Sequence, residues 1–249
     1  MQGSNNWSYR INGGQVGDGF DSSQIRKCTY AFRNNTEMTE APFFDTSNAT
    51  DMSYMFNNCT NLTKTPSYNT SKVTNMSYMF CGCESLIEVS QLDTSHVNNM
   101  EYMFKDCKKL IKIPTIDMSA ATTVRGIFNN CTSLLEAPTI INNNATDMRN
   151  AFYGCSNLTK ISNIDTSNVT KMNSMFFNCS NLTDLSQLDC SKVTDITTAI
   201  NSCTSLVNFG GFLNIGKAYT SKSEGVYAYT INLPASGTLS HDSLMNIIN

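Results

Sequence analysis

The sequence predicts an α/β solenoid, in which short repeated units stack along one axis. Two observations support this prediction. The first is a period of 24 residues that runs without insertion from Phe32 to Ile200. The second is a change of apolar spacing inside each unit, from a helical pattern to a strand-like run. Strict self-similarity at a fixed period is the sequence signature of stacked repeats, each of which contacts only its neighbours.

Three residue types mark the period. An aromatic residue recurs every 24 positions, a cysteine follows it by three positions, and a leucine follows the cysteine by three more. The phenylalanine column is Phe32, Phe56, Phe80, Phe104, Phe128, Phe152 and Phe176, continued by Ile200; the cysteine column is Cys59, Cys83, Cys107, Cys131, Cys155, Cys179 and Cys203; the leucine column is Leu62, Leu86, Leu110, Leu134, Leu158, Leu182 and Leu206. The columns predict eight coils over residues 25–212.

The first part of each unit has helical spacing. Met76, Met79, Phe80 and Cys83 stand at i, i+3, i+4 and i+7, which places them on one stripe of a short helix. Thr74 precedes this stripe as a helix N-cap. A short helix is therefore expected at the same place in every unit.

The second part of each unit reads as a short strand followed by a turn. After Leu86 the run "IEV" is apolar around one charge, and proline, which cannot donate a ladder hydrogen bond, follows in four units. An Asp-Thr-Ser turn then leads into the next unit. These prolines are Pro42, Pro66, Pro114 and Pro138.

The expected elements also predict curvature. Parallel strands stack ~4.8 Å apart, whereas packed helices prefer ~8–10 Å. The strands should therefore form a short parallel sheet on a concave face, with the helices on the convex face. This is a leucine-rich-repeat-like geometry.

Three regions follow from the repeat. Residues 1–24 are expected to form an N-terminal cap, residues 25–212 the solenoid, and residues 213–249 a C-terminal cap that stops short of its natural end. The first residues lack the apolar segment of a signal peptide, so we expect either that the protein is not exported by that route or that the chain is trimmed.

Several copies resemble a known family. The segments "DTSNATDMSYMFNNCTNL" (45–62), "NTSKVTNMSYMFCGCESL" (69–86) and "DTSNVTKMNSMFFNCSNL" (165–182) are similar to BspA-like leucine-rich-repeat surface proteins. More narrowly, they resemble the subtype whose repeat reads D-T-S-x-V-T-x-M-x-x-M-F-x-x-C-x-x-L. The resemblance implies a bacterial or protist surface protein that binds other macromolecules. It implies no fixed binding residues.

Composition and motifs argue against most chemistry. The net charge of −3 gives no basic surface for nucleic acid, and no apolar run is long enough to span a membrane. No cysteine–histidine cluster has zinc spacing, and no nucleophile–base set is present. We therefore expect no enzyme activity, no cofactor and no metal, with the cysteine column packed in the core and only Cys81 and Cys190 open to reagents.

Two regular polar columns are interpreted structurally. The aspartates before Thr-Ser favour Asx turns over calcium binding. At the middle of each predicted strand the charge alternates, which indicates a self-neutralised surface. We refer to this set as the charge column: Glu40, Lys64, Glu88, Lys112, Glu136, Lys160, Asp184 and Asn208.

Candidate contact residues are those that break the repeat or recur on its exposed side. Arginine and aromatic side chains dominate interaction hot spots. For Tyr54, Tyr78 and Tyr102 the favoured interpretation is packing in the grooves between neighbouring helices, and the alternative is an aromatic binding strip. The candidates are Arg125, Arg149, Tyr153 and Phe177 first, then Tyr54, Tyr78 and Tyr102.

Two functions remain open at this stage. One is a monomeric, surface-exposed or extracellular adhesion module that binds a protein or glycan. The other is a structural or receptor-binding segment of a larger assembly, such as a phage fibre in a virion. The sequence favours the first because it combines a repeated frame with no catalytic constellation.

Overall fold

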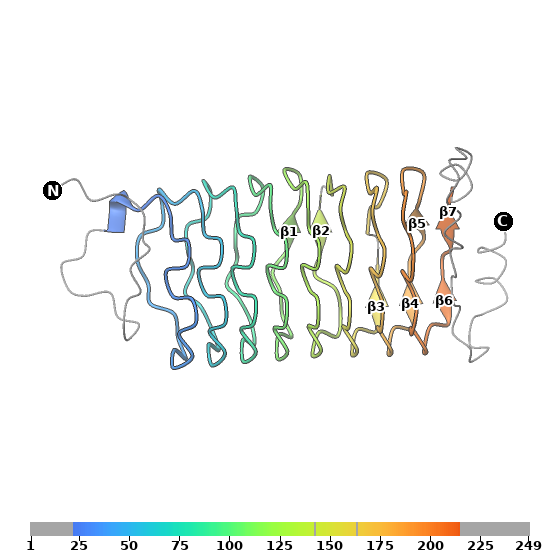
Figure 1. Ribbon diagram of the computed structural model, residues 1–249, viewed down its shortest axis with the longest axis horizontal. Helices are drawn as coiled ribbons and strands as arrows, with labels where there is room; N and C mark the ends of the chain where they lie inside the picture. Colours follow the sequence, from blue (N-terminus) through green and yellow to red (C-terminus); the bar gives the residue numbers. More distant parts are fainter. Residues whose placement is uncertain (1–21, 142, 163, 215–249) are drawn as a thin grey trace.

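The computed structural model describes residues 22–141, 143–162 and 164–214. These residues form one row of stacked coils (Figure 1). Parallel backbone pairing joins residues that are 24 positions apart, as between Lys160 and Asp184 and between Asp184 and Asn208. The predictions of a stacked repeat fold and of parallel strands are confirmed.

The regular elements are short. The 3-10 helix η1 spans Ser22–Gln24, and every strand has two residues. Strands β1 and β2 form one sheet, β3, β4 and β6 a second, and β5 and β7 a third, with all pairs parallel. The strands are β1 (Ile116–Asp117), β2 (Ile140–Ile141), β3 (Lys160–Ile161), β4 (Asp184–Leu185), β5 (Leu188–Asp189), β6 (Asn208–Phe209) and β7 (Phe212–Leu213).

Isolated parallel bridges extend the pairing along the stack. One ladder passes through a single position in every coil, and its members are Lys27, Asp51, Asn75, Asn99, Thr123, Asp147, Lys171 and Asp195. The charge column pairs between Glu40 and Lys64, between Glu88 and Lys112, and from Glu136 through β3 to β6. Backbone hydrogen bonds between coils therefore hold more than one side of each coil.

The predicted short helices are wrong. The segment after each Thr cap consists of successive turns, in which Met79 N–H donates to Met76 O and Cys83 N–H donates to Phe80 O. The alternate N–H groups donate to the next coil instead, for example Met76 to Asn99 O at 3.0 Å and Phe80 to Met103 O at 2.9 Å. Each turn thus forms hydrogen bonds within its own coil and hydrogen bonds to the next coil along the stack.

Left-handed residues explain why no helix forms. In each turn segment two residues four positions apart have positive φ, as Tyr54 (58°) and Asn58 (60°) do. L-residues in this region interrupt a right-handed helix, and Asn and Gly tolerate it best. The second position is Asn, Gly, Asp or Ser in every coil: Asn34, Asn58, Gly82, Asp106, Asn130, Gly154, Asn178 and Ser202.

The predicted curvature is also wrong. It rested on a helical side with wider spacing, but the turn side is hydrogen-bonded between coils as closely as the strand side. Phe104 N–H lies 2.9 Å from Ile127 O on the turn side, and Ile116 N–H lies 2.9 Å from Thr139 O on the strand side. Equal spacing on both sides gives a straight stack, as Figure 1 shows.

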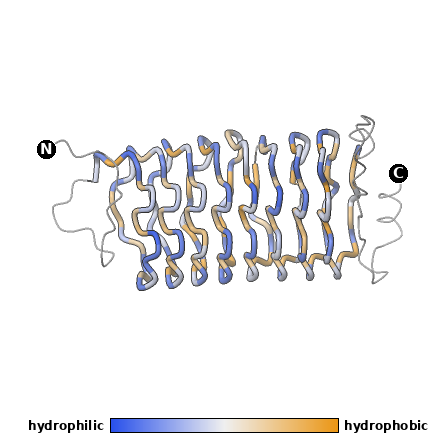
Figure 2. Tube along the Cα trace, in the orientation of Figure 1, coloured by the Kyte–Doolittle hydropathy of each residue, from blue (hydrophilic) through white to orange (hydrophobic). Residues whose placement is uncertain are grey.

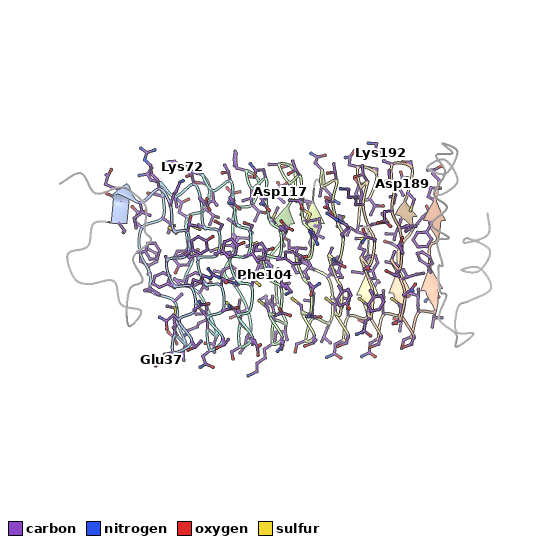
Figure 3. The ribbon with its side chains drawn as sticks, viewed as in Figure 1. Glu37, Lys72, Phe104, Asp117, Asp189 and Lys192 are labelled. Carbon is purple, nitrogen blue, oxygen red and sulfur yellow. The ribbon has the colours of Figure 1, made fainter. Side chains whose placement is uncertain are left out.

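The core runs the length of the stack. Apolar and polar segments alternate along each coil (Figure 2), and the phenylalanine, cysteine and leucine columns are buried as predicted. Phe104, labelled in Figure 3, lies inside the coil, and its ring stacks on Phe80 at 5.5 Å and on Phe128 at 5.8 Å between centroids. The ring contacts continue through the column from Phe32 to Phe176, with all pairs stacked except Phe128 and Phe152, whose rings are tilted by 35°.

The cysteine column has a specific structural role. Each thiol donates a hydrogen bond to the carbonyl oxygen of the phenylalanine one coil earlier, as Cys107 Sγ does to Phe80 O at 3.1 Å. The same carbonyl accepts the N–H of Cys83 in its own coil at 3.0 Å. All ten cysteines are free and buried. The prediction that this column is core is confirmed.

The expectation that Cys81 and Cys190 are open to reagents is wrong. Cys81 is 8% exposed and Cys190 1% exposed. Burial raises the pKa of both thiols, that of Cys190 to about 12, so neither forms the reactive thiolate at neutral pH.

All ten thiols are therefore expected to resist a water-soluble maleimide in native buffer and to react after denaturation. Mass spectrometry of labelled protein checks this, because each added group changes the mass by a fixed amount. Rapid native labelling at Cys107, one of the most deeply buried thiols, would contradict the described packing.

The segments in which Ser stands two residues after Asp form the predicted Asx turns. Ser47 N–H donates to Asp45 Oδ1 at 2.8 Å, and Ser191 N–H donates to Asp189 Oδ1 at 2.8 Å. The following threonine connects neighbouring coils, since Asp117 N–H donates to Thr94 Oγ1 at 2.9 Å. Asp117 and Asp189 lie toward one edge of the stack, near Lys72 and Lys192 (Figure 3).

The predicted caps fall largely outside the described residues. Residues 1–21 and 215–249 are not described. Of the predicted N-terminal cap, the structure describes η1. Leu213, expected to begin the C-terminal cap, pairs in β7 with Asp189 of β5, so the ladder continues one residue past the predicted boundary.

Candidate interaction surface

Four stacked tyrosines lie on the turn side of the first coils. We refer to Tyr30, Tyr54, Tyr78 and Tyr102 as the tyrosine row. Their ring centroids are 4.9 Å, 4.6 Å and 5.2 Å apart in order along the stack. The three predicted tyrosines are therefore in mutual contact. Tyr30, which the sequence analysis did not single out, extends the row and occupies the same position of the period.

The turn geometry places the row outside the core. Each tyrosine is one of the left-handed residues of its turn, with φ of 61°, 58°, 56° and 53° in order along the chain. The neighbouring methionines, such as Met52 and Met55, are fully buried, whereas Tyr54 is half-buried and Tyr30 is 44% exposed. The rings therefore pack on one another at the surface.

Cationic side chains lie at both ends of the row. The Arg33 guanidinium carbon is 5.3 Å from the Tyr30 centroid and 5.8 Å from the Tyr54 centroid. At the other end Arg125 lies 5.5 Å from the Tyr102 centroid and forms an ion pair with Glu101 at 3.6 Å. Arg125 thus lies next to the tyrosine row, with its cation over the face of the last ring.

Gly126 marks the end of the row. It occupies the next tyrosine position of the period, with φ of 59°. A Cβ atom built there would collide with the Tyr102 ring, which tilts by 42° relative to Tyr78. The absence of a side chain at Gly126 therefore leaves space for the last tyrosine.

The other predicted contact residues form two separate groups. Arg149 donates through Nε and Nη2 to the carboxylate of Asp147 in its own coil, with Nη2 2.6 Å from Oδ2. Tyr153 and Phe177 stack with centroids 5.0 Å apart and rings 9° from parallel, and we call them the aromatic pair. No contact between the aromatic pair and the tyrosine row is found among the described residues.

The hydroxyl groups of the row have no hydrogen-bond partner in the part of the chain that the structure describes. By contrast, Tyr68, buried in the core, donates to Pro42 O at 2.7 Å. Burial, with a contribution from the Glu101 carboxylate, raises the pKa of Tyr78 to about 12. The Tyr78 hydroxyl is therefore protonated at neutral pH and can both donate and accept hydrogen bonds.

The tyrosine row presents hydroxyl edges and cationic ends at the surface. Its ring faces are occupied by each other and by arginine, so the hydroxyl edges and the cations at each end are what a partner can contact. His96 is exposed and contacts Ser95 Oγ, while His241 lies outside the described residues. Within residues 22–214, positions 142 and 163 aside, no group of His, Cys, Asp and Glu could hold a metal ion.

No helix of the described chain is long and apolar enough to cross a membrane. No curated protein and no solved structure matches the sequence. A family model does match, over residues 26–142 and 141–224, which together cover the repeats. That match is consistent with a BspA-like repeat family. The chain belongs to the family described as Mycoplasma protein of unknown function, DUF285.

Proposed function

We propose that this chain is a non-catalytic binding module, displayed at the cell surface, that recognises a protein or a glycan through the tyrosine row and Arg125. In this proposal its units are eight coils of the BspA-like D-T-S-x-V-T subtype. The observation that carries the proposal is the row of four neighbouring tyrosines, whose hydroxyls have no hydrogen-bond partner among the described residues, with a guanidinium at each end.

The spacing of the row suits an extended polar ligand. Coils repeat every ~4.8 Å, so four hydroxyls extend over ~14 Å. Because the rings face each other, a sugar ring cannot stack on them, and the hydroxyls must recognise the ligand by hydrogen bonds. The flanking arginines suit carboxylate or carbonyl groups at the ligand's ends.

The first-ranked sequence candidates are less well placed. Arg149 is engaged by Asp147, and releasing it would leave that carboxylate without its closest cation. The aromatic pair is self-stacked and carries one hydroxyl, on Tyr153. We therefore assign the contacts to the tyrosine row and Arg125.

Replacing tyrosine by phenylalanine tests the hydroxyls without removing the stack. A triple variant, Tyr54→Phe, Tyr78→Phe and Tyr102→Phe, is expected to weaken binding at least roughly tenfold, about 1.4 kcal/mol. The melting temperature should change little because the ring contacts remain. Biolayer interferometry against purified extracellular-matrix proteins and a glycan panel measures the binding.

Tyr153→Phe is the matched control, since it removes one hydroxyl outside the row and should leave affinity within about twofold. Alanine at Arg149, Tyr153 and Phe177 together examines the second group of candidates. Loss of binding in that variant but not in the phenylalanine triple would move the site to the aromatic pair and Arg149. If no panel member binds the unmodified chain, the proposal fails.

The straight stack favours a second role, as a structural or receptor-binding segment of a larger assembly such as a phage fibre. A rod with equal spacing on both sides keeps its two ends on one axis, which suits a spacer. An export signal or wall anchor in the full-length gene would favour surface display. A neighbourhood of virion genes would favour the spacer.

A further inference from the structure

The charge column lies beside an exposed apolar row on the strand side of the stack. Ile87, Ile111 and Leu135 occupy one position of three consecutive coils and are 44%, 57% and 56% exposed. Ile111 N–H donates to Ile87 O at 3.0 Å, so these two side chains stand side by side. Each precedes a charged residue directly, namely Glu88, Lys112 and Glu136. We call these three hydrophobic residues the apolar row.

The charges at the middle of the column form no ion pair with one another in the part of the chain that the structure describes. Lys64 and Glu40 form an ion pair at 2.9 Å. Glu88 and Lys112 are partners in a parallel backbone bridge, but their side chains form no ion pair. Among the described residues, Lys112 and Glu136 form no ion pair either. The predicted self-neutralisation therefore occurs at the first pair and leaves the middle of the column open to an outside partner.

Alternating charge makes this surface complementary to a second copy of itself in one orientation. A two-fold axis along the stack would place each position opposite its own equivalent, so that like charges met. A two-fold axis perpendicular to the stack reverses the direction of one copy. Residues that lie at equal distances on opposite sides of this axis then face each other. With that centre between Lys112 and Glu136, every charged pair from position 64 to position 184 is of opposite sign.

We propose that two copies of this chain associate through the charge column and the apolar row, antiparallel about this two-fold axis. Lys112 then faces Glu136 of the second copy, Glu88 faces its Lys160, and Lys64 faces its Asp184. At the centre Ile111 meets Leu135 of the second copy, twice by symmetry, which buries the two most exposed members of the apolar row. This dimer replaces the monomer expected from the sequence.

The size of the surface sets the expected affinity. From position 40 to position 208 the column spans seven steps of ~4.8 Å, about 34 Å in all. A width of about four residues, ~13 Å, gives roughly 900 Å² buried in total, at the low end for specific interfaces. A dissociation constant on the order of 10 µM is therefore expected.

Charge reversal with restoration tests the proposal. In sedimentation equilibrium the unmodified chain should dimerise at ~100 µM. Lys112→Glu places two pairs of like charges across the axis and should weaken the dimer at least roughly tenfold. Glu136→Lys should do the same. The double variant Lys112→Glu with Glu136→Lys restores both pairs and should return to within about threefold of the unmodified affinity.

Lys72→Glu is the matched control, because it makes the same charge change at the opposite edge of the stack (Figure 3) and should leave the dimer intact. Lys160→Glu, which would face Glu88 of the second copy, replaces Lys112→Glu if that variant does not fold. A monomer at ~100 µM would overturn the proposal. So would a dimer that both reversals leave unchanged, or a double variant that dimerises more weakly than either single one.

Discussion

Raising the pH from about 8 to about 10 is expected to unfold this protein, because the folded state holds its thiols in their neutral form. Burial raises the pKa of Cys59, Cys155 and Cys203 from 9.0 to about 12. Burial also raises the pKa of the other members of the column, Cys83, Cys107, Cys131 and Cys179, well above its ordinary value. In the unfolded chain the same thiols ionise near 9.0.

The sign follows from proton binding. Between the unfolded and folded pKa values the folded state binds more protons, so the free energy of unfolding falls as the pH rises. Each thiol removes ~1.4 kcal/mol between about pH 8 and about pH 10. The seven column thiols together remove ~10 kcal/mol, which equals the whole stability of an ordinary domain.

Urea unfolding followed by circular dichroism at several pH values measures this effect. Cys107→Ser is the matched variant, since its hydroxyl can donate to Phe80 O but does not titrate near this pH. Its free energy of unfolding should fall less steeply as the pH rises, because about one fewer proton is released on unfolding. A free energy of unfolding that stays level up to about pH 10 would falsify the assignment of buried neutral thiols.

Phe104→Ala is expected to destabilise the protein by ~3–5 kcal/mol. The ring is 1% exposed and stacks on a phenylalanine on each side, so its removal opens a cavity between two packed rings. Neighbouring coils cannot close this space without breaking their shared backbone ladder. Chemical unfolding of the purified variant gives the free-energy difference.

The same change at Phe32 should have a smaller effect. Phe32 stacks on one phenylalanine of the column, Phe56 at 5.3 Å, and on Phe44 at 6.1 Å with the rings tilted. Stability in a repeat stack is roughly a sum of unit and neighbour terms, so a terminal coil loses fewer neighbour contacts. Equal losses at Phe32 and Phe104 would contradict this linear description.

The sequence predicted what depends on the period. A spacing of 24 residues determines which residues pair between coils, and it identified the phenylalanine, cysteine and leucine columns that form the core. The Asx turns were predictable because Asp followed by Ser specifies a local hydrogen bond, as at Asp45 and Ser47.

The helices were not correctly predicted because two structures share one apolar spacing. Successive turns bury Met76, Met79, Phe80 and Cys83 as a helix would. The distinguishing signal was the column containing Asn58 and Gly82, residue types that favour left-handed conformations. Once the helices were assumed, a wider convex side and a curved stack followed from them.

The candidate surface was predictable only in part. Tyr54, Tyr78 and Tyr102 came from the period, which would also have identified Tyr30. That Arg125 covers Tyr102 while Arg149 turns to Asp147 depends on side-chain direction. Both arginines occupy the same position of the period, so the repeat alone cannot distinguish them.

The orientation of the backbone ladders determines how the protein responds to tension. Hydrogen bonds between coils run along the axis of the stack, so a force that pulls the two ends of the chain apart loads one coil at a time. Each coil that detaches releases 24 residues, roughly 80 Å of extended chain, before the next is loaded. A molecule anchored at one end and attached at the other would therefore lengthen stepwise and dissipate energy at each step.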